Sequence, residues 1–289
     1  MDIRKVTVLG TGVLGSQIAF QTAYCGFEVT AYDISDAALA TAKTRFDSLI
    51  AAYKADRYEG YDQGRPEQAA ASIALTTDLA AAVADADLVI EAVPETMAIK
   101  TSTYEQLAKV APEKTIFATN SSTLLPSALM ESTGRPDRFL ALHFANEIWR
   151  NNTAEVMRTS KTDPAVFDEV TAFAEQIKMV AIKVLKEQPG YVLNSLLVPL
   201  LDAAASLLAK GVADVETIDK TWRVATGAPL GPFQIFDVVG LNTAYNIVSL
   251  NPDPSLQAFS KLVKEEYLDK GRLGRATGEG FYTYPAPAK

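Results

Sequence analysis

A glycine motif directly after a short apolar run is the feature that most constrains the fold. The run is KVTVL, residues 5–9, and Gly10, Gly12 and Gly15 follow it in the pattern GxGxxG. The next segment, VLGSQIAFQTAYCG, has helical spacing. A strand, a glycine turn and a helix in this order open a Rossmann-type unit, in which the glycines let backbone N–H groups approach a pyrophosphate.

A carboxylate stands where such a unit needs one. Asp33 ends the second predicted strand, EVTAY, at the spacing of about 20 residues from which an acidic side chain reaches the ribose hydroxyls of a dinucleotide. The same carboxylate would repel a 2′-phosphate, so we expect NAD rather than NADP. Val13 and Leu14, in the first helical turn, belong to the same expected cofactor site. The alternative is a glycine-rich turn without a ligand, and four residues in register make it a poor one.

Further apolar runs alternate with helical patterns along the first two thirds of the chain. They cover residues 88–90, 115–118, 139–142 and 180–184. This alternation predicts an α/β fold with a doubly wound, mainly parallel sheet. After KEQPGYV the strand patterns stop and helical patterns continue to about Gly271. We therefore expect an NAD-binding Rossmann domain over residues 1–186, an all-α domain over 187–289, and a substrate cleft between them.

Composition limits the partners. The chain has 289 residues, 48% of them hydrophobic, and a formal net charge of -8. An acidic chain is repelled by phosphate backbones and anionic lipid, so we expect a small-molecule substrate and neither nucleic acid nor a membrane. The most apolar stretch, residues 194–209, contains Pro199 and Asp202 and is expected to be a buried helix.

Cysteine content and the first residues suggest the compartment. Cys25 is the single cysteine, so an internal disulfide is excluded, and we expect it to pack inertly beside Gly26. The opening MDIRK lacks the pattern of a signal peptide. A cytoplasmic location is the expectation. The polar, glycine- and tyrosine-rich residues 55–68 are expected to form an exposed loop between two helices of the first domain.

The titratable residues exclude several dehydrogenase chemistries. One cysteine and one histidine cannot supply the ligand set of a zinc alcohol dehydrogenase, and no metal site is expected. No tyrosine is followed four residues later by lysine, so the short-chain proton relay is also missing. His143, in RFLALHFAN, is the remaining base that titrates near neutral pH. It follows an apolar run, so it lies at the carboxyl end of a predicted strand, where open α/β sheets bind ligands.

Taken together, these segments resemble the 3-hydroxyacyl-CoA dehydrogenase family over nearly the whole chain. The family's motifs occur in order as GTGVLGSQIA, EAVPETMAIK, TNSSTL, RFLALHFAN, QPGYVLNSLLVPLL, GAPLGPFQIFDVVGLN and TGEGFYTY. The resemblance implies interconversion of a short-chain 3-hydroxyacyl-CoA and its 3-ketoacyl-CoA with NAD. It also implies a homodimer formed through the helical domain.

The resemblance assigns roles residue by residue. His143 would be the general base and Glu155 the carboxylate that orients it. Ser122 would hydrogen-bond the reacting oxygen, and Asn194 would help to polarise the carbonyl. On the cofactor side, the matching residues are Glu95, Lys100 and Asn146.

Each assignment has a plainer alternative. Glu155 could be a surface carboxylate at a strand edge, and Ser122 could cap the helix expected before LLPSALM. Asn194 could belong to a structural hydrogen-bond network, because an amide in an apolar helix needs a partner. Lys100 could be a solvated charge on a helix.

The chain departs from its family beside the predicted base. The family continues with Asn-Pro and an apolar stretch, whereas this chain reads FANEIWRNNTAE, with Glu147, Trp149, Arg150 and Asn151. In acyl-CoA members a serine and a lysine contact CoA from the helix after Asp33. An ungapped count places Leu49 and Asp56 at those two positions, and Ala276 replaces a lysine before TGEGFY.

Two other functions stay open. The segments SSTLLPSAL and VLKEQPGYVLN are similar to relatives that oxidise free hydroxy acids such as gulonate or carnitine. A non-catalytic NAD-binding or structural protein is the other alternative. The joint presence of His143, Glu155, Ser122 and Asn194 argues against it.

Overall fold

The computed structural model describes residues 3–284. It divides into two units, Met1–Val192 and Leu193–Lys289, each with its own core. The boundary expected from sequence, after Lys186, lies a few residues before this division. Each unit is described by itself.

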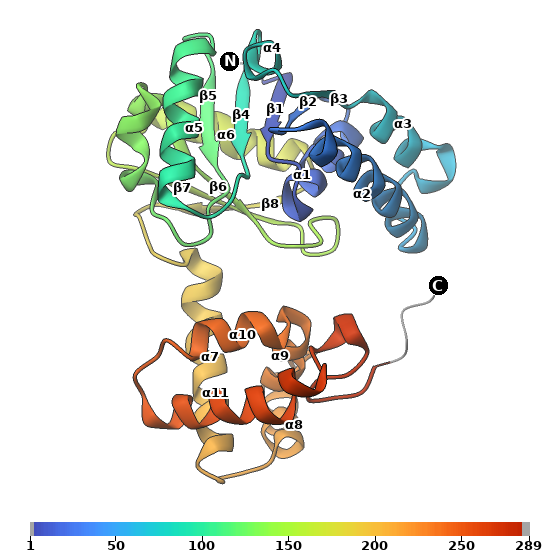
Figure 1. Ribbon diagram of the computed structural model, residues 1–289, viewed down its shortest axis with the longest axis vertical. Helices are drawn as coiled ribbons and strands as arrows, with labels where there is room; N and C mark the ends of the chain where they lie inside the picture. The colour runs from blue at the N-terminus through green and yellow to red at the C-terminus, as the bar shows by residue number, and fades with distance from the viewer. Residues whose placement is uncertain (1–2, 285–289) are drawn as a thin grey trace. The chain divides into compact units, whose positions relative to one another are not determined.

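The first unit contains an eight-stranded sheet with the order β3-β2-β1-β4-β5-β6-β7-β8 (Figure 1). Every neighbouring pair is parallel except β6 and β7, which are antiparallel. The α/β fold with a mainly parallel sheet is therefore confirmed. The strands are β1 (Lys5–Leu9), β2 (Glu28–Tyr32), β3 (Ala74–Thr76), β4 (Leu88–Glu91), β5 (Ile116–Thr119), β6 (Phe139–Phe144), β7 (Thr153–Arg158) and β8 (Val180–Val184).

Helices cover both faces of this sheet, because the central strands carry apolar side chains on both sides. One core cluster contains Val6 and Val8 of β1 with Ile18 and Phe173 of two helices. The other contains Leu9 with Tyr104 and Leu107. The helices are α1 (Val13–Tyr24), α2 (Asp36–Ala55), α3 (Arg65–Ser72), α4 (Leu79–Val83), α5 (Met97–Val110) and α6 (Pro164–Gln176).

Strand β7 was not among the runs found from sequence. Its sequence, TAEVMR, mixes polar residues with apolar ones, so it lacks the continuous apolar run of the other buried strands. It nevertheless lies between β6 and β8, with its middle four residues buried. This strand carries Glu155 and pairs directly with the strand that carries His143.

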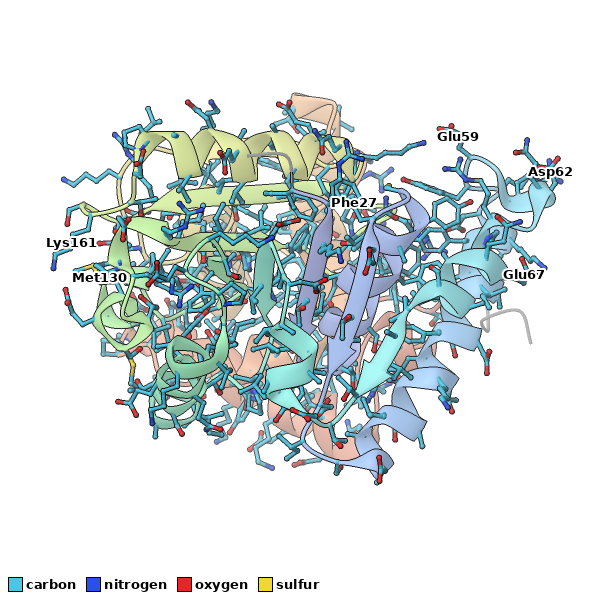
Figure 2. All side chains as sticks on the ribbon, turned by 90° about the horizontal axis from the view of Figure 1, so that it is seen from above. Phe27, Glu59, Asp62, Glu67, Met130 and Lys161 are labelled. Atoms are coloured by element: carbon cyan, nitrogen blue, oxygen red, sulfur yellow. The ribbon has the colours of Figure 1, made fainter. Side chains whose placement is uncertain are left out.

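The segment 55–68 joins α2 to α3, as expected, although it is partly ordered as a short 3-10 turn at Tyr61–Gln63, and α3 already begins at Arg65. Figure 2 shows Glu59, Asp62 and Glu67 together at one end of the first unit, opposite Met130 and Lys161. Two of these acidic residues form ion pairs: Lys178 binds Glu59 and Lys54 binds Glu67.

The second unit is helical, which confirms the expected all-α domain. Two buried carboxylates organise it. Asp219 accepts hydrogen bonds from the backbone N–H groups of Phe233 and Gln234, and Asp237 accepts them from Phe281 and Tyr282. The segments GAPLGPF and TGEGFYTY are thereby fixed to the helices. These are α7 (Tyr191–Ala209), whose first two residues belong to the first unit, α8 (Val215–Thr226), α9 (Pro232–Val239), α10 (Leu241–Val248) and α11 (Pro254–Glu266).

Helix α7 corrects one expectation. The stretch 194–209 was expected to be buried, but most of its side chains are half-buried or exposed in this chain, and Leu196 is 70% exposed. The apolar pattern is therefore not explained by the core of this chain. Among the described residues, α7 is the one helix long and apolar enough to cross a membrane, a test that the helix of a soluble protein also passes.

Candidate functional site

In the turn between β1 and α1, two glycines are closely packed and the third, Gly12, faces open space. Gly10 has a φ of 89°, and a Cβ there would lie 2.6 Å from the carbonyl oxygen of Ala92. A Cβ on Gly15 would lie 1.9 Å from the carbonyl oxygen of Gly10. Gly12, the N-cap of α1, has nothing within 4 Å of the Cβ position, which leaves the helix N-terminus open to an anion. Val13 is exposed and Leu14 half-buried in the first turn.

A cavity of about 490 Å³ continues from this turn. Asp33 lines it, and its Oδ2 accepts hydrogen bonds from the Thr11 N–H at 2.7 Å and the Thr11 hydroxyl at 2.6 Å. The walls include apolar side chains of Val93, Pro94 and Ile99. An anion-binding helix end, a fixed carboxylate and an apolar slot together fit the pyrophosphate, ribose and adenine of a dinucleotide.

His143 and Glu155 are directly opposite each other on the antiparallel strands β6 and β7. His143 Nδ1 lies 3.1 Å from Glu155 Oε2, and both side chains are buried, with residue exposures of 7% and 4%. The alternative that Glu155 is a surface carboxylate at a strand edge is therefore wrong. A buried carboxylate at this distance fixes the orientation of the ring.

Ser122 meets the other ring nitrogen. Its Oγ lies 3.1 Å from His143 Nε2, and it lies in the loop that follows β5. The capping alternative is wrong, because the next helical turn begins at Pro126 with Leu125 as its N-cap. Ser122, His143 and Glu155 therefore form one line of hydrogen-bonding atoms, in which a proton can pass between a ligand at Nε2 and the ring while the carboxylate holds Nδ1.

Lys100 is buried, with 1% exposure, so the alternative of a solvated charge is wrong. Its Nζ lies 2.5 Å from Glu91 Oε1 and 3.2 Å from Glu95 Oε2. Glu91, at the end of β4, also accepts hydrogen bonds from the hydroxyls of Tyr104 and Thr119. Glu91 was not predicted from the sequence, where its only signal is a charge at the end of an otherwise apolar run.

Glu95 links this buried pair to the loop after β5 that carries Ser122. It accepts hydrogen bonds from the Ser121 hydroxyl and from the N–H and hydroxyl of Thr123. Burial alone would raise the pKa of Glu95, but these hydrogen bonds and Lys100 together lower it to about 2. Two of the predicted cofactor-side residues thus support the loop that carries Ser122.

The lowered pKa of Glu95 predicts a specific acid sensitivity. Because the folded-state pKa lies below the unfolded one, its stabilisation is complete above about pH 4.5 and is lost as the pH falls towards about 2. We expect Glu95→Gln to flatten the fall of the urea midpoint in this window. Glu105→Gln, on an exposed position of α5, should follow the wild type. An unchanged slope in Glu95→Gln would contradict this role.

Two predicted residues are not brought to the dyad by any described contact within the first unit. Asn146 is exposed, and its backbone carbonyl accepts a hydrogen bond from the Asn151 side chain at 2.8 Å. Asn194 is half-buried on α7 and belongs to the second unit. The roles of Asn146 beside the cofactor and of Asn194 beside the substrate stay predictions.

The divergent loop after His143 is tied to α2. Asp56 accepts a hydrogen bond from Trp149 Nε1 at 2.7 Å and binds the Arg150 guanidinium through both carboxylate oxygens. Arg150 also donates to Glu147 at 2.9 Å. A hollow of about 350 Å³ lies between this loop and helices α1 and α2, and Leu49 is among its lining residues. The residues that depart from the family pattern therefore form one structural unit.

Comparison with known proteins decides the family. The description "3-hydroxyacyl-CoA dehydrogenase, NAD binding domain" matches residues 5–188, and the C-terminal domain of the same family matches residues 190–284. The chain belongs to the 3-hydroxyacyl-CoA dehydrogenase family. It is accordingly an NAD-dependent oxidoreductase that acts on CH-OH groups, and the glycine turn and Asp33 belong to its NAD-binding domain.

Individual relatives cover almost the whole chain. Human mitochondrial hydroxyacyl-coenzyme A dehydrogenase is 35% identical over 98% of this chain and 91% of its own. The solved (S)-3-hydroxybutyryl-CoA dehydrogenase of Ralstonia eutropha is 30% identical, covers 98% of this chain and 99% of its own, and has a TM-score of 0.81. A solved diketoreductase, described as acting on dicarbonyl compounds, is 62% identical, covers 98% of this chain and 100% of its own, and has a TM-score of 0.96.

Proposed function

We propose that this enzyme of the 3-hydroxyacyl-CoA dehydrogenase family reduces one keto group of a small dicarbonyl compound to a hydroxyl with NADH, and catalyses the reverse oxidation with NAD. The observation that carries the proposal is the hydrogen-bonded line of Ser122, His143 and Glu155 at the end of the sheet. NAD supplies a hydride acceptor or donor at nicotinamide C4. The protein supplies the proton and holds the carbonyl.

His143 is the proton-transfer residue of this mechanism. In reduction, protonated Nε2 donates to the oxygen of the carbonyl as that oxygen becomes a hydroxyl, and in oxidation Nε2 takes the proton back. Glu155 holds Nδ1 and so keeps Nε2 directed toward that oxygen. Ser122, 3.1 Å from Nε2, donates a hydrogen bond to the same oxygen. We assign Asn194 a second hydrogen bond to that oxygen, as the resemblance implies.

Several residues fit the cofactor. Gly10, Gly12 and Gly15 shape the backbone for the pyrophosphate, and Asp33 fits the ribose hydroxyls. The resemblance assigns Glu95, Lys100 and Asn146 to the cofactor side of the site. The buried pairing of Lys100 with Glu91 and Glu95 supports a rigid placement of the first two.

The substrate class rests on α2 and the loop that it holds. Acyl-CoA members carry a lysine for CoA where this chain has Asp56, and the carboxylate is held by Arg150 and Trp149. The Arg150 guanidinium lowers the pKa of Asp56, so this position holds an ionised carboxylate paired with Arg150 and lacks the free cation that would bind a CoA phosphate. The 62% identity to a diketoreductase supports the same substrate class. A free dicarbonyl compound needs no CoA site.

A 3-ketoacyl-CoA is the second candidate, because the human and Ralstonia eutropha relatives are named for acyl-CoA substrates. A free hydroxy acid such as gulonate or carnitine is the third. In all three reactions one carbon is interconverted between a hydroxyl-bearing and a keto form, so the proposed roles of His143 and Ser122 are common to them.

A parallel assay separates these candidates. NADH oxidation would be followed with acetylacetone, ethyl acetoacetate and acetoacetyl-CoA, and NAD reduction with 3-hydroxybutyrate, gulonate and carnitine. We expect the highest kcat/KM with a free dicarbonyl compound, and no competitive inhibition by free CoA. Turnover of acetoacetyl-CoA alone, with inhibition by CoA, would reject the dicarbonyl proposal and assign the acyl-CoA activity.

We also propose a homodimer formed through the second unit, in the cytoplasm. The unit exposes large apolar side chains at Leu196, Val212, Val224 and Leu250, with exposures of 70%, 65%, 78% and 84%. A second copy would remove such side chains from water. Light scattering on the eluted protein should give twice the chain mass of 31.1 kDa, and a value of one chain mass would reject the dimer.

A further inference from the structure

The end of the first unit contacts His143, Glu155 and the residue directly before Ser122. Tyr191 is the second-to-last residue of this unit and is buried, with 1% exposure. Its ring stacks on the imidazole of His143, with 4.4 Å between the ring centroids and 14° between the planes. Among the described residues, Tyr191 is the one aromatic ring that stacks on His143. This contact fixes the plane of the imidazole ring, which the hydrogen bonds at its two nitrogens leave free to tilt.

Tyr191 also contacts the loop after β5 that carries Ser122. The Tyr191 hydroxyl donates a hydrogen bond of 2.6 Å to the backbone carbonyl of Ser121, the residue before Ser122. Burial and the nearby Glu155 raise the pKa of Tyr191, so the phenol keeps the proton that it donates. One side chain therefore connects the imidazole plane to the backbone that places the Ser122 hydroxyl.

The backbone of this turn holds the third member. The Val192 N–H donates a hydrogen bond of 2.9 Å to Glu155 Oε1, while Oε2 faces His143. Tyr191 adopts a φ of 55°, directly after Gly190 with a φ of 77°. A left-handed backbone is unfavourable for a tyrosine, and it persists where surrounding contacts hold it. The stacking on His143, the hydroxyl bond to Ser121 and the Tyr191 N–H bond of 3.0 Å to the Gln188 carbonyl are among the contacts that hold it here.

We infer that Tyr191 is a positioning residue for the proton transfer, which sets the plane of the His143 ring by stacking and keeps Ser122 within reach of Nε2. The inference rests on the proposed function, because it concerns how the proposed base is held. In the sequence, Tyr191 belongs to the motif QPGYVLNSLLVPLL and no role of its own was predicted for it.

The single histidine of the chain gives a direct test that needs no substrate. The imidazole carbon-bound protons of His143 give the only histidine signals in an NMR spectrum of the holoenzyme. Stacking on Tyr191 should shift these signals upfield through the tyrosine ring current. Tyr191→Phe keeps the aromatic ring and should keep the shift, whereas Tyr191→Leu should lose it. Signals that are the same in all three proteins would overturn the stacking.

Kinetics test the consequence. We expect Tyr191→Leu to lower kcat by about 30-fold with the KM for NADH nearly unchanged, because a tilted base is misplaced for transfer but does not bind the cofactor. Tyr191→Phe should retain most of the wild-type kcat. Phe173→Leu, a comparable truncation of a buried ring on α6, should lower the melting temperature and leave kcat close to wild type. Equal kcat values for Tyr191→Leu and Phe173→Leu would overturn the inference.

A double variant separates this inference from the proposed function. If Tyr191 acts through His143, adding Tyr191→Leu to His143→Gln should cause little further loss, since the base is already gone. An additive loss would mean that Tyr191 acts elsewhere. If His143→Gln alone stays active, the proposed function fails, and the NMR comparison still decides the stacking. If Tyr191→Leu does not fold, Tyr191→Phe and Tyr191→Trp are compared by NMR and kinetics instead. We expect the His143 signals to stay shifted upfield in both variants. Unshifted His143 signals in both would overturn the inference.

Discussion

His143→Gln should lower kcat by about 10²- to 10⁴-fold, the range for loss of a positioned general acid–base. Glutamine can accept a hydrogen bond from Ser122 but cannot exchange a proton with the substrate oxygen near neutral pH. Binding of NADH should be little changed, because the glycine turn and Asp33 lie at the other end of the expected cofactor site. The measurement is steady-state NADH oxidation with the best substrate of the panel.

Glu155→Gln is the matched comparison for this variant. It keeps the shape of the dyad but removes the charge beside Nδ1, so we expect a smaller loss of kcat than for His143→Gln. Melting temperatures would show that both proteins are folded. A folded His143→Gln enzyme with wild-type kcat would refute His143 as the proton-transfer residue.

Lys100→Met should destabilise the first unit by about 3–5 kcal/mol, the cost of leaving a buried carboxylate without its partner. Lys100 and Glu91 are both buried, with exposures of 1% and 0%, and their charged atoms lie 2.5 Å apart. Methionine fills a similar volume, so the loss reports the missing charge more than a cavity. Urea unfolding followed by circular dichroism gives the free energy of unfolding.

An exposed ion pair provides the control for Lys100→Met. Lys161 pairs with Glu131 at the surface, with side-chain exposures of 50% and 67%, so Lys161→Met should change the free energy of unfolding by at most about 1 kcal/mol. Adding Glu91→Gln to Lys100→Met should recover part of the loss, because it removes the unpaired charge. Equal effects of Lys100→Met and Lys161→Met would show that burial of the pair does not matter.

The parts of the fold with a strong local pattern could be predicted from sequence. The apolar runs that became β1, β2, β4, β5, β6 and β8, the glycine turn and the helical second unit all have a clear periodicity or a motif. Strand β7 could not be predicted from sequence. Its burial comes from its neighbours β6 and β8, and its own sequence mixes polar and apolar residues.

The same distinction applies to the site. His143 could be singled out because it is the only histidine, and Ser122 and Glu155 through their motif. Their distances depend on strand register, which sequence spacing does not reveal. Glu91 and Tyr191 were not predicted, because a charge at a strand end and a tyrosine in a helical pattern are common. Only three-dimensional contacts distinguish them.

The apolar stretch at 194–209 shows the opposite failure. Its pattern predicted burial within the chain, but the pattern reports only that the surface avoids water, and a second copy of the chain satisfies that requirement as well as a core does. The dimer proposal follows from this difference.

The central claim is hydride transfer from NADH to the carbonyl carbon of a free dicarbonyl compound, with the proton from His143. NADH deuterated at nicotinamide C4, prepared separately for each face, tests it directly with acetylacetone as acceptor. We expect one of the two preparations to place a single deuterium on the carbon that bears the new hydroxyl, in a one-to-one ratio with NADH consumed. A hydroxy ketone without deuterium from either preparation, or NADH oxidation without this product, would contradict it.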